Sequence, residues 1–211
     1  MLNMDFRKTL AIETDSMPWE ASPSPSVFRK RLAREERESG HATSLVKYTS
    51  NASFHSHPHP KGEEILVLDG IFSDETGDYP AGTYIRNPPG STHAAFSVNG
   101  CVLFVKLDQF QTGDNKTVSQ NTMESDRSVE ILHQYKNETT CLIQLENGSK
   151  FQLDDATTGV EVLVISGSVS INNQLLSQHG WFRGIQDNLE MAACSISTRL
   201  LLKTGHLTHS E

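Results

Sequence analysis

The stretch His57-Pro-His-Pro-Lys-Gly-Glu63 places three metal-binding side chains within seven residues, and His93 adds a fourth further along the chain. In an extended strand, residues two apart point to the same face, so the imidazoles of His57 and His59 lie side by side with Cα atoms about 6.6 Å apart. Glu63 has the same parity, provided that the intervening turn preserves the alternation. The residue types and their spacing therefore predict a metal site.

The spacing of these residues resembles the two sequence motifs of the cupin superfamily. The first motif is His-x-His, three or four residues, Glu, six residues and Gly, which matches residues 57–70. The second is Gly, five residues, Pro-x-Gly, two residues and His, which matches residues 82–93. The Asn that usually closes the second motif is Ser97 here, and the usual Gly before the first His is missing, but neither position binds metal in that family. The resemblance implies a double-stranded β-helix, or jelly-roll, barrel with a metal site.

Residues 54–107 resemble one branch of the superfamily more closely, the cupin domain of ChrR-type anti-sigma factors. This resemblance implies one divalent metal ion held by His57, His59, Glu63 and His93. It favours zinc, with iron, manganese or nickel as alternatives, since three imidazoles and a carboxylate suit several of these ions. Relatives of this branch include dioxygenases that cleave small diketones and hydroxyketones.

Several neighbouring residues leave alternatives open. Glu64 adjoins the predicted acidic ligand and could replace it, or the three histidines could hold the ion alone. His55 shares the parity of His57 and could orient it through a hydrogen bond, although an exposed histidine at a strand end explains it equally well. Arg86 and Asn87 precede a Pro-Pro-Gly turn, and we interpret them as solvent-facing rather than as contacts to a substrate.

The second half of the chain repeats the first with a shift of 97 residues, so that residues 43–54 align with 140–151 and 64–70 with 161–167. Internal repeats of this length indicate a duplicated structural unit. Both copies have alternating, β-branched runs bounded by Gly, Asn, Asp and Ser, which predict antiparallel strands joined by tight turns. We therefore predict an all-β protein with two tandem cupin barrels.

The two copies differ at the predicted metal ligands. In the second copy the residues at the positions of His57, His59 and Glu63 are Asp154, Ala156 and Val160. The position of His93 falls near Met191. The second barrel is therefore predicted to be degenerate, keeping the fold without the metal ligands. In such an arrangement the degenerate barrel usually serves as a packing partner, in place of the second subunit of a cupin dimer.

The predicted domains are an N-terminal barrel at 1–110, preceded by an extended arm, and a degenerate barrel at 111–211. The polar stretch 108–127 is the expected linker. Prolines in the arm cannot donate to a central ladder, which favours an extended edge. Residues 28–38 are predicted as strand and turn, although their Arg, Leu, Ala and Glu content makes a helix the alternative.

Composition excludes several classes of function. The formal net charge is −8, which argues against a nucleic-acid partner, and Arg29-Lys30-Arg31 is interpreted as a solvated charged segment. No apolar run reaches the 18 or so residues of a membrane span, and the N-terminus has no signal-peptide pattern, so a cytoplasmic location is expected. The three cysteines, Cys101, Cys141 and Cys194, do not suggest a disulfide framework.

Three functions fit these observations. The first is a regulatory module that binds or senses a small molecule at the metal. ChrR-type factors bind their sigma partner through a separate zinc domain containing Cys-x-x-Cys, and this sequence has no such pair, which argues against direct sigma binding. The second is a non-haem dioxygenase, with Fe(II) on His57, His59 and His93, that cleaves a small diketone or hydroxyketone. The third is a metal-stabilised scaffold, and either a monomer or a homodimer is expected.

Overall fold

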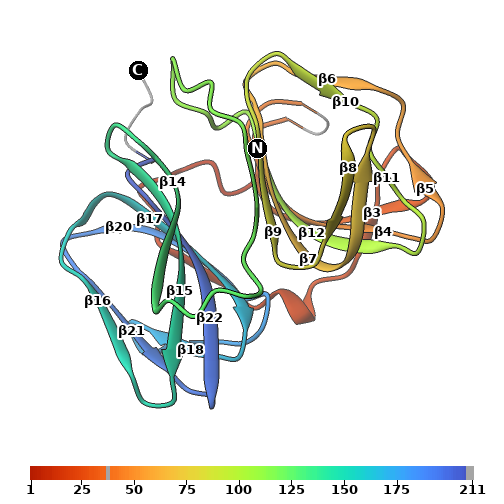
Figure 1. The fold of residues 1–211 in the computed structure, drawn as a ribbon. Helices are drawn as coiled ribbons and strands as arrows, with labels where there is room; N and C mark the ends of the chain where they lie inside the picture. The colour runs from red at the N-terminus through yellow and green to blue at the C-terminus, as the bar shows by residue number, and fades with distance from the viewer. Residues whose placement is uncertain (37–38, 208–211) are drawn as a thin grey trace. The chain divides into compact units, whose positions relative to one another are not determined.

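The computed structural model describes residues 1–36 and 39–207. Within these ranges the regular structure is β-strand, apart from one 3-10 turn at Thr14–Ser16. The predicted all-β class is confirmed, and the strands form two barrels (Figure 1), as predicted. By their contacts, Met1–Met4 and Pro18–Glu124 make one unit, and Asp5–Met17 joins the chain from Ser125 onward in the other.

The first unit contains the predicted metal ligands. Its strands are β2 (Glu20–Ala21), β3 (Val27–Arg34), β4 (Ala42–Tyr48), β5 (Ala52–Ser53), β6 (His57–His59), β7 (Glu63–Asp74), β8 (Gly77–Pro80), β9 (Thr83–Asn87), β10 (Ser91–His93), β11 (Phe96–Ser97), β12 (Cys101–Leu107) and β13 (Val118–Asn121). Residues 28–34 are strand, as predicted, and the helix alternative does not hold there. The remainder of that prediction includes 37–38, which lie outside the described residues.

The main sheet of the first unit has the order β13-β9-β7-β12-β4-β3-β2, and β5, β8 and β11 pair with it off this path. Strand β7 is twelve residues long, and its second half leaves the main ladder to pair with β8 and β11. Strands β6 and β10 form a separate antiparallel ribbon (Figure 1). Apolar side chains on the inner face of the main sheet, such as Val46, Ile65 and Leu103, form the buried core.

The glycine that ends the first cupin motif has a backbone role. Gly70 lies in β7 with φ of +72°, and a Cβ atom there would come within 2.2 Å of the Gly100 carbonyl oxygen. Gly167 is its repeat in the second unit, with φ of +79° and the Ser197 carbonyl oxygen 2.3 Å from a Cβ. Only glycine adopts this left-handed conformation without strain and also permits such a close backbone approach. Both copies therefore need glycine at this position.

The second unit repeats the strand order of the first. Its strands are β1 (Leu10–Ile12), β14 (Val129–Tyr135), β15 (Glu138–Glu146), β16 (Lys150–Leu153), β17 (Ala156–Ser166), β18 (Val169–Ile171), β19 (Gln174–Leu176), β20 (Trp181–Gln186), β21 (Leu189–Ala193) and β22 (Ser197–Thr204). The order β20-β17-β22-β15-β14 corresponds to β9-β7-β12-β4-β3 in the first unit. The predicted duplication is thus visible in the hydrogen-bonded ladders.

Two short strands belong to a different unit from the one that the predicted boundary at residue 110 assigns to them. Strand β13 pairs with β9 inside the first unit, although it belongs to the stretch predicted as a linker. Strand β1 pairs with β20 inside the second unit, although it belongs to the predicted N-terminal arm. In both cases a short strand hydrogen-bonds an edge of a sheet, which covers backbone groups that would otherwise be open to pairing.

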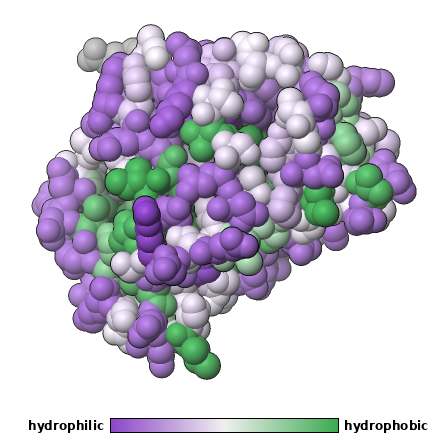
Figure 2. Space-filling model, viewed as in Figure 1, coloured by the Kyte–Doolittle hydropathy of each residue, from purple (hydrophilic) through white to green (hydrophobic). Residues whose placement is uncertain are grey.

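Hydrophilic residues dominate the face of the molecule shown in Figure 2, and hydrophobic residues there form small separate groups. The exposed large hydrophobic side chains include Val98, Met123, Ile131, Leu175 and Ile196. Single exposed apolar residues are ordinary on protein surfaces. In the described part of the chain no helix is long and apolar enough to cross a membrane.

Candidate metal centre

The β6–β10 ribbon brings the three predicted histidines together. Its register sets His93 directly opposite His57, and His59 is two residues further along β6 on the same face. The ring centroids lie 4.9 Å apart for His57 and His59, 5.2 Å for His57 and His93, and 4.8 Å for His59 and His93. One ring nitrogen of each lies within 4.8 Å of the others.

The carboxylate beside these imidazoles belongs to Glu63, at the start of β7. Its Oε2 atom lies 3.5 Å from Nε2 of His59 and 3.5 Å from Nε2 of His93, and the Asn87 side-chain amide donates a 3.0 Å hydrogen bond to it. Glu64 faces the other side of the sheet, where it accepts hydrogen bonds from Tyr84 and Arg86. Between the two acids that the sequence left open, the geometry places Glu63 next to the histidines.

Hydrogen bonds on Nδ1 orient two of the imidazoles. Nδ1 of His57 lies 3.0 Å from the His55 carbonyl oxygen, and Nδ1 of His93 lies 3.4 Å from Oδ2 of Asp74. A carbonyl or carboxylate oxygen only accepts, so Nδ1 carries the proton in each ring and Nε2 keeps its lone pair. Such an outer hydrogen bond is the usual way to fix the tautomer of a metal-binding histidine.

Burial favours the neutral forms of His59, His93 and Glu63 in the absence of a cation. Burial, and then the neighbouring His93 and His57, lower the pKa of His59 to about 3, while burial also lowers the pKa of His93. Burial raises the pKa of Glu63 to about 7, and the hydrogen bond from Asn87 opposes this rise. The 3.5 Å contacts between Glu63 and these imidazoles are therefore not ion pairs, because burial disfavours the charged form of both partners.

The donor set fits a divalent transition metal. Ligand atoms about 2.1 Å from one ion lie about 3.0 to 3.4 Å from their neighbours in octahedral or tetrahedral geometry, close to the 3.5 Å between Glu63 Oε2 and two imidazole nitrogens. Nε2 of His59 is buried and has no hydrogen-bond partner among the described residues. An unpartnered buried nitrogen is costly unless a ligand satisfies it, and an ion at this point would do so.

A cavity of about 490 Å³ opens beside the histidines and Glu63, within the first unit. Inner-face residues of the main sheet line it, among them Val46, Ile65 and Leu103. This volume lies in the range of small-molecule sites, and a mostly apolar wall with a few polar groups is typical of them. A ligand in this cavity would touch the imidazole cluster directly.

Two residues near the site differ from their sequence interpretation. Arg86 was predicted to face solvent but is fully buried, and it pairs with Glu64 and with Asp114 at 2.7 Å, on the sheet face opposite the histidines. Asn87 was also predicted to face solvent, but it is half-buried and hydrogen-bonded to Glu63. The alternation of β9 explains both, because adjacent residues of a strand point to opposite faces.

Two further residues of the metal centre and its cavity were not predicted from the sequence. Asp74, at the end of β7, turns Oδ2 toward His93 while its Oδ1 accepts from the Thr76 backbone N–H at 2.8 Å. The Asp-x-Thr-Gly turn after a long strand is the only signal in the sequence that could have pointed to it. Arg29 was interpreted as a solvated charge, but it lines the cavity. The sequence of such a strand shows which side chains face the cavity only when the register of the strand is known.

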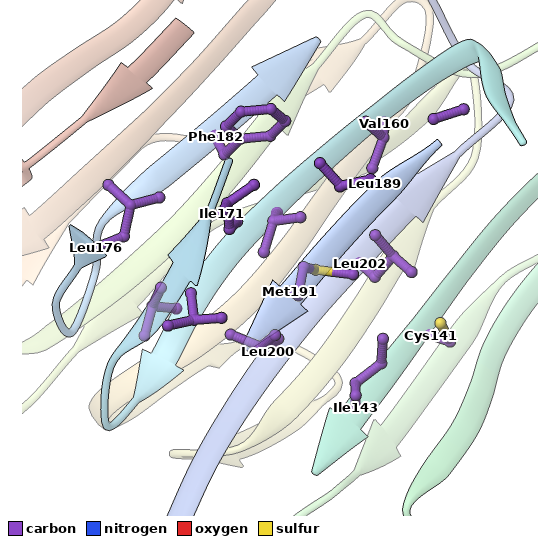
Figure 3. Packing of buried hydrophobic residues seen from close by; sticks show 14 residues of the cluster. Cys141, Ile143, Val160, Ile171, Leu176, Phe182, Leu189, Met191, Leu200 and Leu202 are labelled. Carbon is purple, nitrogen blue, oxygen red and sulfur yellow. The ribbon is translucent and has the colours of Figure 1, made fainter. Parts of the chain in front are cut away.

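The second unit fills the corresponding positions with core. Ala156, Val160 and Met191, which align with His59, Glu63 and the region of His93, are fully buried in one hydrophobic cluster. Figure 3 shows Val160 and Met191 among other buried apolar side chains of this unit. Asp154, aligned with His57, is exposed. These positions cannot reproduce the imidazole cluster of the first unit.

Comparisons with known proteins agree with this architecture. Residues 7–111 match the family model of the ChrR Cupin-like domain. Similar solved structures include the bacterial pirin YhhW in complex with nickel(II) from Escherichia coli, with a TM-score of 0.75 at 13% identity, covering 93% of this chain and 99% of that one. A putative dioxygenase from Nostoc punctiforme gives a TM-score of 0.73 at 12% identity, covering 97% and 85% of the two chains.

The chain belongs to the cupin superfamily. Protein Ylba from Escherichia coli, at 12% identity and a TM-score of 0.75, is similar over 98% of this chain and 94% of its own. At such identities these structures establish the fold and leave the activity to the site itself. No curated protein sequence matches the chain at a significant level.

Proposed function

We propose that this protein is a divalent-metal-binding bicupin, in which His57, His59, Glu63 and His93 hold one ion that binds or senses a small molecule. The observation that carries the proposal is the orphaned Nε2 of His59, buried 3.5 Å from Oε2 of Glu63. The lone pairs on Nε2 of His57 and His93, left by their hydrogen bonds through Nδ1, support it. Zinc is the ion favoured by resemblance, and iron, manganese and nickel suit the same donors.

The cavity supports ligand binding at the ion rather than a closed structural site. Four protein ligands on an octahedral ion leave two positions for water or another ligand. A cavity of about 490 Å³ adjoins the histidines and gives a small molecule room to reach those positions. Asn87 donates a hydrogen bond that holds the Glu63 carboxylate in place, and the wall of the cavity beside it is mostly apolar.

A metal-dependent dioxygenase is the second candidate. A bound ion would supply Lewis-acid or redox chemistry to a coordinated oxygen. The cavity and the neutral imidazoles suit a small chelating carbonyl compound, and one similar structure is described as a putative dioxygenase. This chain would contribute the ligands and the apolar pocket that orients the compound.

Metal analysis of the purified protein tests the proposal. We expect about one divalent ion per chain, and we expect the double variant His57→Ala/His93→Ala to lose it. The matched control is Asp154→Ala in the second unit, which aligns with His57 and is exposed, and it should keep the full metal content. A wild-type protein without metal, or a double variant that keeps it, would contradict the proposed site.

Oxygen consumption separates the two candidate functions. The iron-loaded protein would be incubated with acetylacetone-like and hydroxyacetophenone-like compounds while dissolved oxygen is recorded. Consumption that the double histidine variant lacks supports the dioxygenase. Binding of such compounds without oxygen consumption supports the sensor.

A further inference from the structure

Two hydroxyl groups line the cavity from strand β4. Alternate residues of a strand share one face, and here one face of β4 lines the cavity with Ala42, Ser44, Val46 and Tyr48. Ser44 and Tyr48 are only 4% and 7% exposed. The neighbouring strand β3 contributes Arg29 and Arg34 to the lining, and both arginines already have interaction partners. The hydroxyls of β4 are therefore the groups to consider as contacts to a ligand.

Neither hydroxyl has a hydrogen bond within the described part of the chain. The Oγ atom of Ser44 is buried without a partner there. The Tyr48 hydroxyl likewise takes part in no hydrogen bond with residues 1–36 or 39–207. A buried hydroxyl without a hydrogen bond costs free energy, and polar groups in protein interiors are nearly always paired. Two unpaired hydroxyls on one wall therefore indicate a partner that enters the cavity from outside.

Aromatic rings lie between Tyr48 and the metal ligands. The Tyr48 ring contacts the rings of Phe54 and Phe72 edge-on, with centroids 5.6 and 6.1 Å apart. The Phe54 ring lies 5.8 Å from that of His57, and the Phe72 ring lies 5.9 Å from that of His93. Both phenylalanines also line the cavity. The lining thus passes from the imidazoles to apolar rings and then to a phenol, which suits a ligand with a hydrocarbon body between two polar ends.

The Tyr48 phenol keeps its proton at neutral pH and can therefore donate it to a ligand. Burial raises the pKa of this phenol above its ordinary value of 10.0 and is the largest influence on it. The Glu63 carboxylate and Cys101 raise this pKa further, and Arg29 opposes the rise. A neutral phenol donates one hydrogen bond through its O–H group. The matching group on a ligand is an acceptor oxygen.

The second copy has lost both hydroxyls together with the metal ligands. The shift of 97 residues places Cys141 and Leu145 at the positions of Ser44 and Tyr48. Cys141 lies in the hydrophobic cluster of the second unit (Figure 3), and Leu145 packs against that cluster. The second copy keeps the barrel without either hydroxyl, so the fold does not require them. Their presence in the first unit fits a role in what its cavity binds.

We propose that Tyr48 donates a hydrogen bond to the ligand of the metal centre, and that this ligand carries an acceptor oxygen on its apolar body, apart from the oxygens that chelate the ion. The ligand is thus a small chelating compound with a further carbonyl oxygen, and the cavity volume of about 490 Å³ accommodates a molecule of that size. Ser44 offers a second hydroxyl on the same wall. This inference rests on the proposed metal site for the chelating end of the ligand.

Four derivatives of the β-diketone benzoylacetone test the proposal on the metal-loaded, full-length protein. Two carry an acetyl group, at the meta or the para position of the ring, and two carry an isopropyl group at the same positions. All four present the same diketone to the metal. Acetyl and isopropyl groups have nearly the same shape, so the acetyl oxygen is the main difference within each pair. Calorimetry gives the ratio of the acetyl to the isopropyl affinity at each ring position.

Tyr48→Phe removes the hydroxyl and keeps the ring that packs on Phe54 and Phe72. It should lower the acetyl-to-isopropyl affinity ratio about fivefold at one or both ring positions, which is the scale of one neutral hydrogen bond. Comparing the ratio between wild type and variant cancels any effect of the substituent on chelation itself. The matched control is Tyr84→Phe, which removes a buried hydroxyl of the same unit that bonds Glu64 on the opposite face of the sheet, and it should keep the wild-type ratio.

The outcomes separate this inference from the proposed function. Thermal melting and metal content are measured on the same samples, so that only folded, metal-loaded proteins are compared. A Tyr48→Phe ratio within twofold of wild type at both positions would mean that water alone satisfies the hydroxyl, and it would overturn this inference while leaving the metal site standing. Metal-loaded protein that binds none of the four compounds would overturn it as well. Wild-type protein without metal would overturn the proposed function and this inference together.

Discussion

Asp74→Asn should weaken metal binding without unfolding the first unit. Asp74 places Oδ2 3.4 Å from Nδ1 of His93, and both side chains are more than nine-tenths buried. Its Oδ1 accepts from the backbone N–H and hydroxyl of Thr76 at 2.8 and 2.6 Å, and an asparagine oxygen can keep that turn. The amide nitrogen would then face Nδ1 of His93 as a donor. This favours the tautomer with a proton on Nε2, the atom that the metal needs.

The expected loss is about 10- to 100-fold in metal affinity, or about 1.4 to 2.7 kcal/mol, which is the usual effect of removing the hydrogen-bond partner of a ligating histidine. A competitive titration with a chromogenic chelator measures it for zinc and nickel. Asp78→Asn is the matched control, because Asp78 lies in the same hairpin and accepts a 2.6 Å hydrogen bond from Ser73 without contacting an imidazole. If Asp74→Asn and Asp78→Asn both bind metal as the wild type does, the assigned role of Asp74 is wrong.

Two other outcomes follow from burial. Burial raises the pKa values of Cys101 and Cys141 to about 11, so at pH 8 about one thiol in a thousand is ionised at either position. The reactivity of these thiols should increase only as the pH approaches 11. Ellman's reagent at pH 8 should therefore titrate Cys194, which is exposed, and reach the other two only in denaturant; three fast thiols in the native protein would refute this. Val160→Glu restores the acid aligned with Glu63 but buries an unpartnered carboxyl in the second core, and it should destabilise the protein by about 3 kcal/mol or more in urea unfolding. Unchanged stability, or a second bound metal ion, would show that this core is not packed as described.

Much of the fold could be predicted because the pattern of each strand is local. The alternation in 42–48 and 101–107 and the 97-residue repeat indicate β-strands and two barrels, and the structure has both. The spacing of the histidines predicts that they converge, and the ribbon register brings their rings within 5.2 Å. Which acid faces them depends on parity across the Pro60-Lys61-Gly62 turn. The sequence could not decide this, because a turn can preserve or reverse alternation.

The residues that were missed depend on long-range register. Arg29 reaches the cavity only because β3 pairs with β4 in one particular register, and Arg34 does so only because of a bulge. Asp74 reaches His93 only because β7 is long enough to leave the main ladder. Arg86 was misjudged because its partner Asp114 is 28 residues away in sequence. Contacts of this kind join distant segments and have no local signature in a single sequence.

The opposite orientations of Glu63 and Glu64 have a consequence for how such a protein changes over time. Glu63 faces the interior of the barrel next to the histidines, whereas Glu64 pairs with Arg86 on the opposite face of the β7 strand. The second copy keeps the reverse-side pair as Glu161 and Arg183, whereas the interior acid has become valine. Because adjacent residues of a strand point to opposite faces, mutations can remove the metal ligands on one face while the residues that stabilise the fold on the other face are kept. Ancestral tandem copies can diverge in function without first losing their architecture.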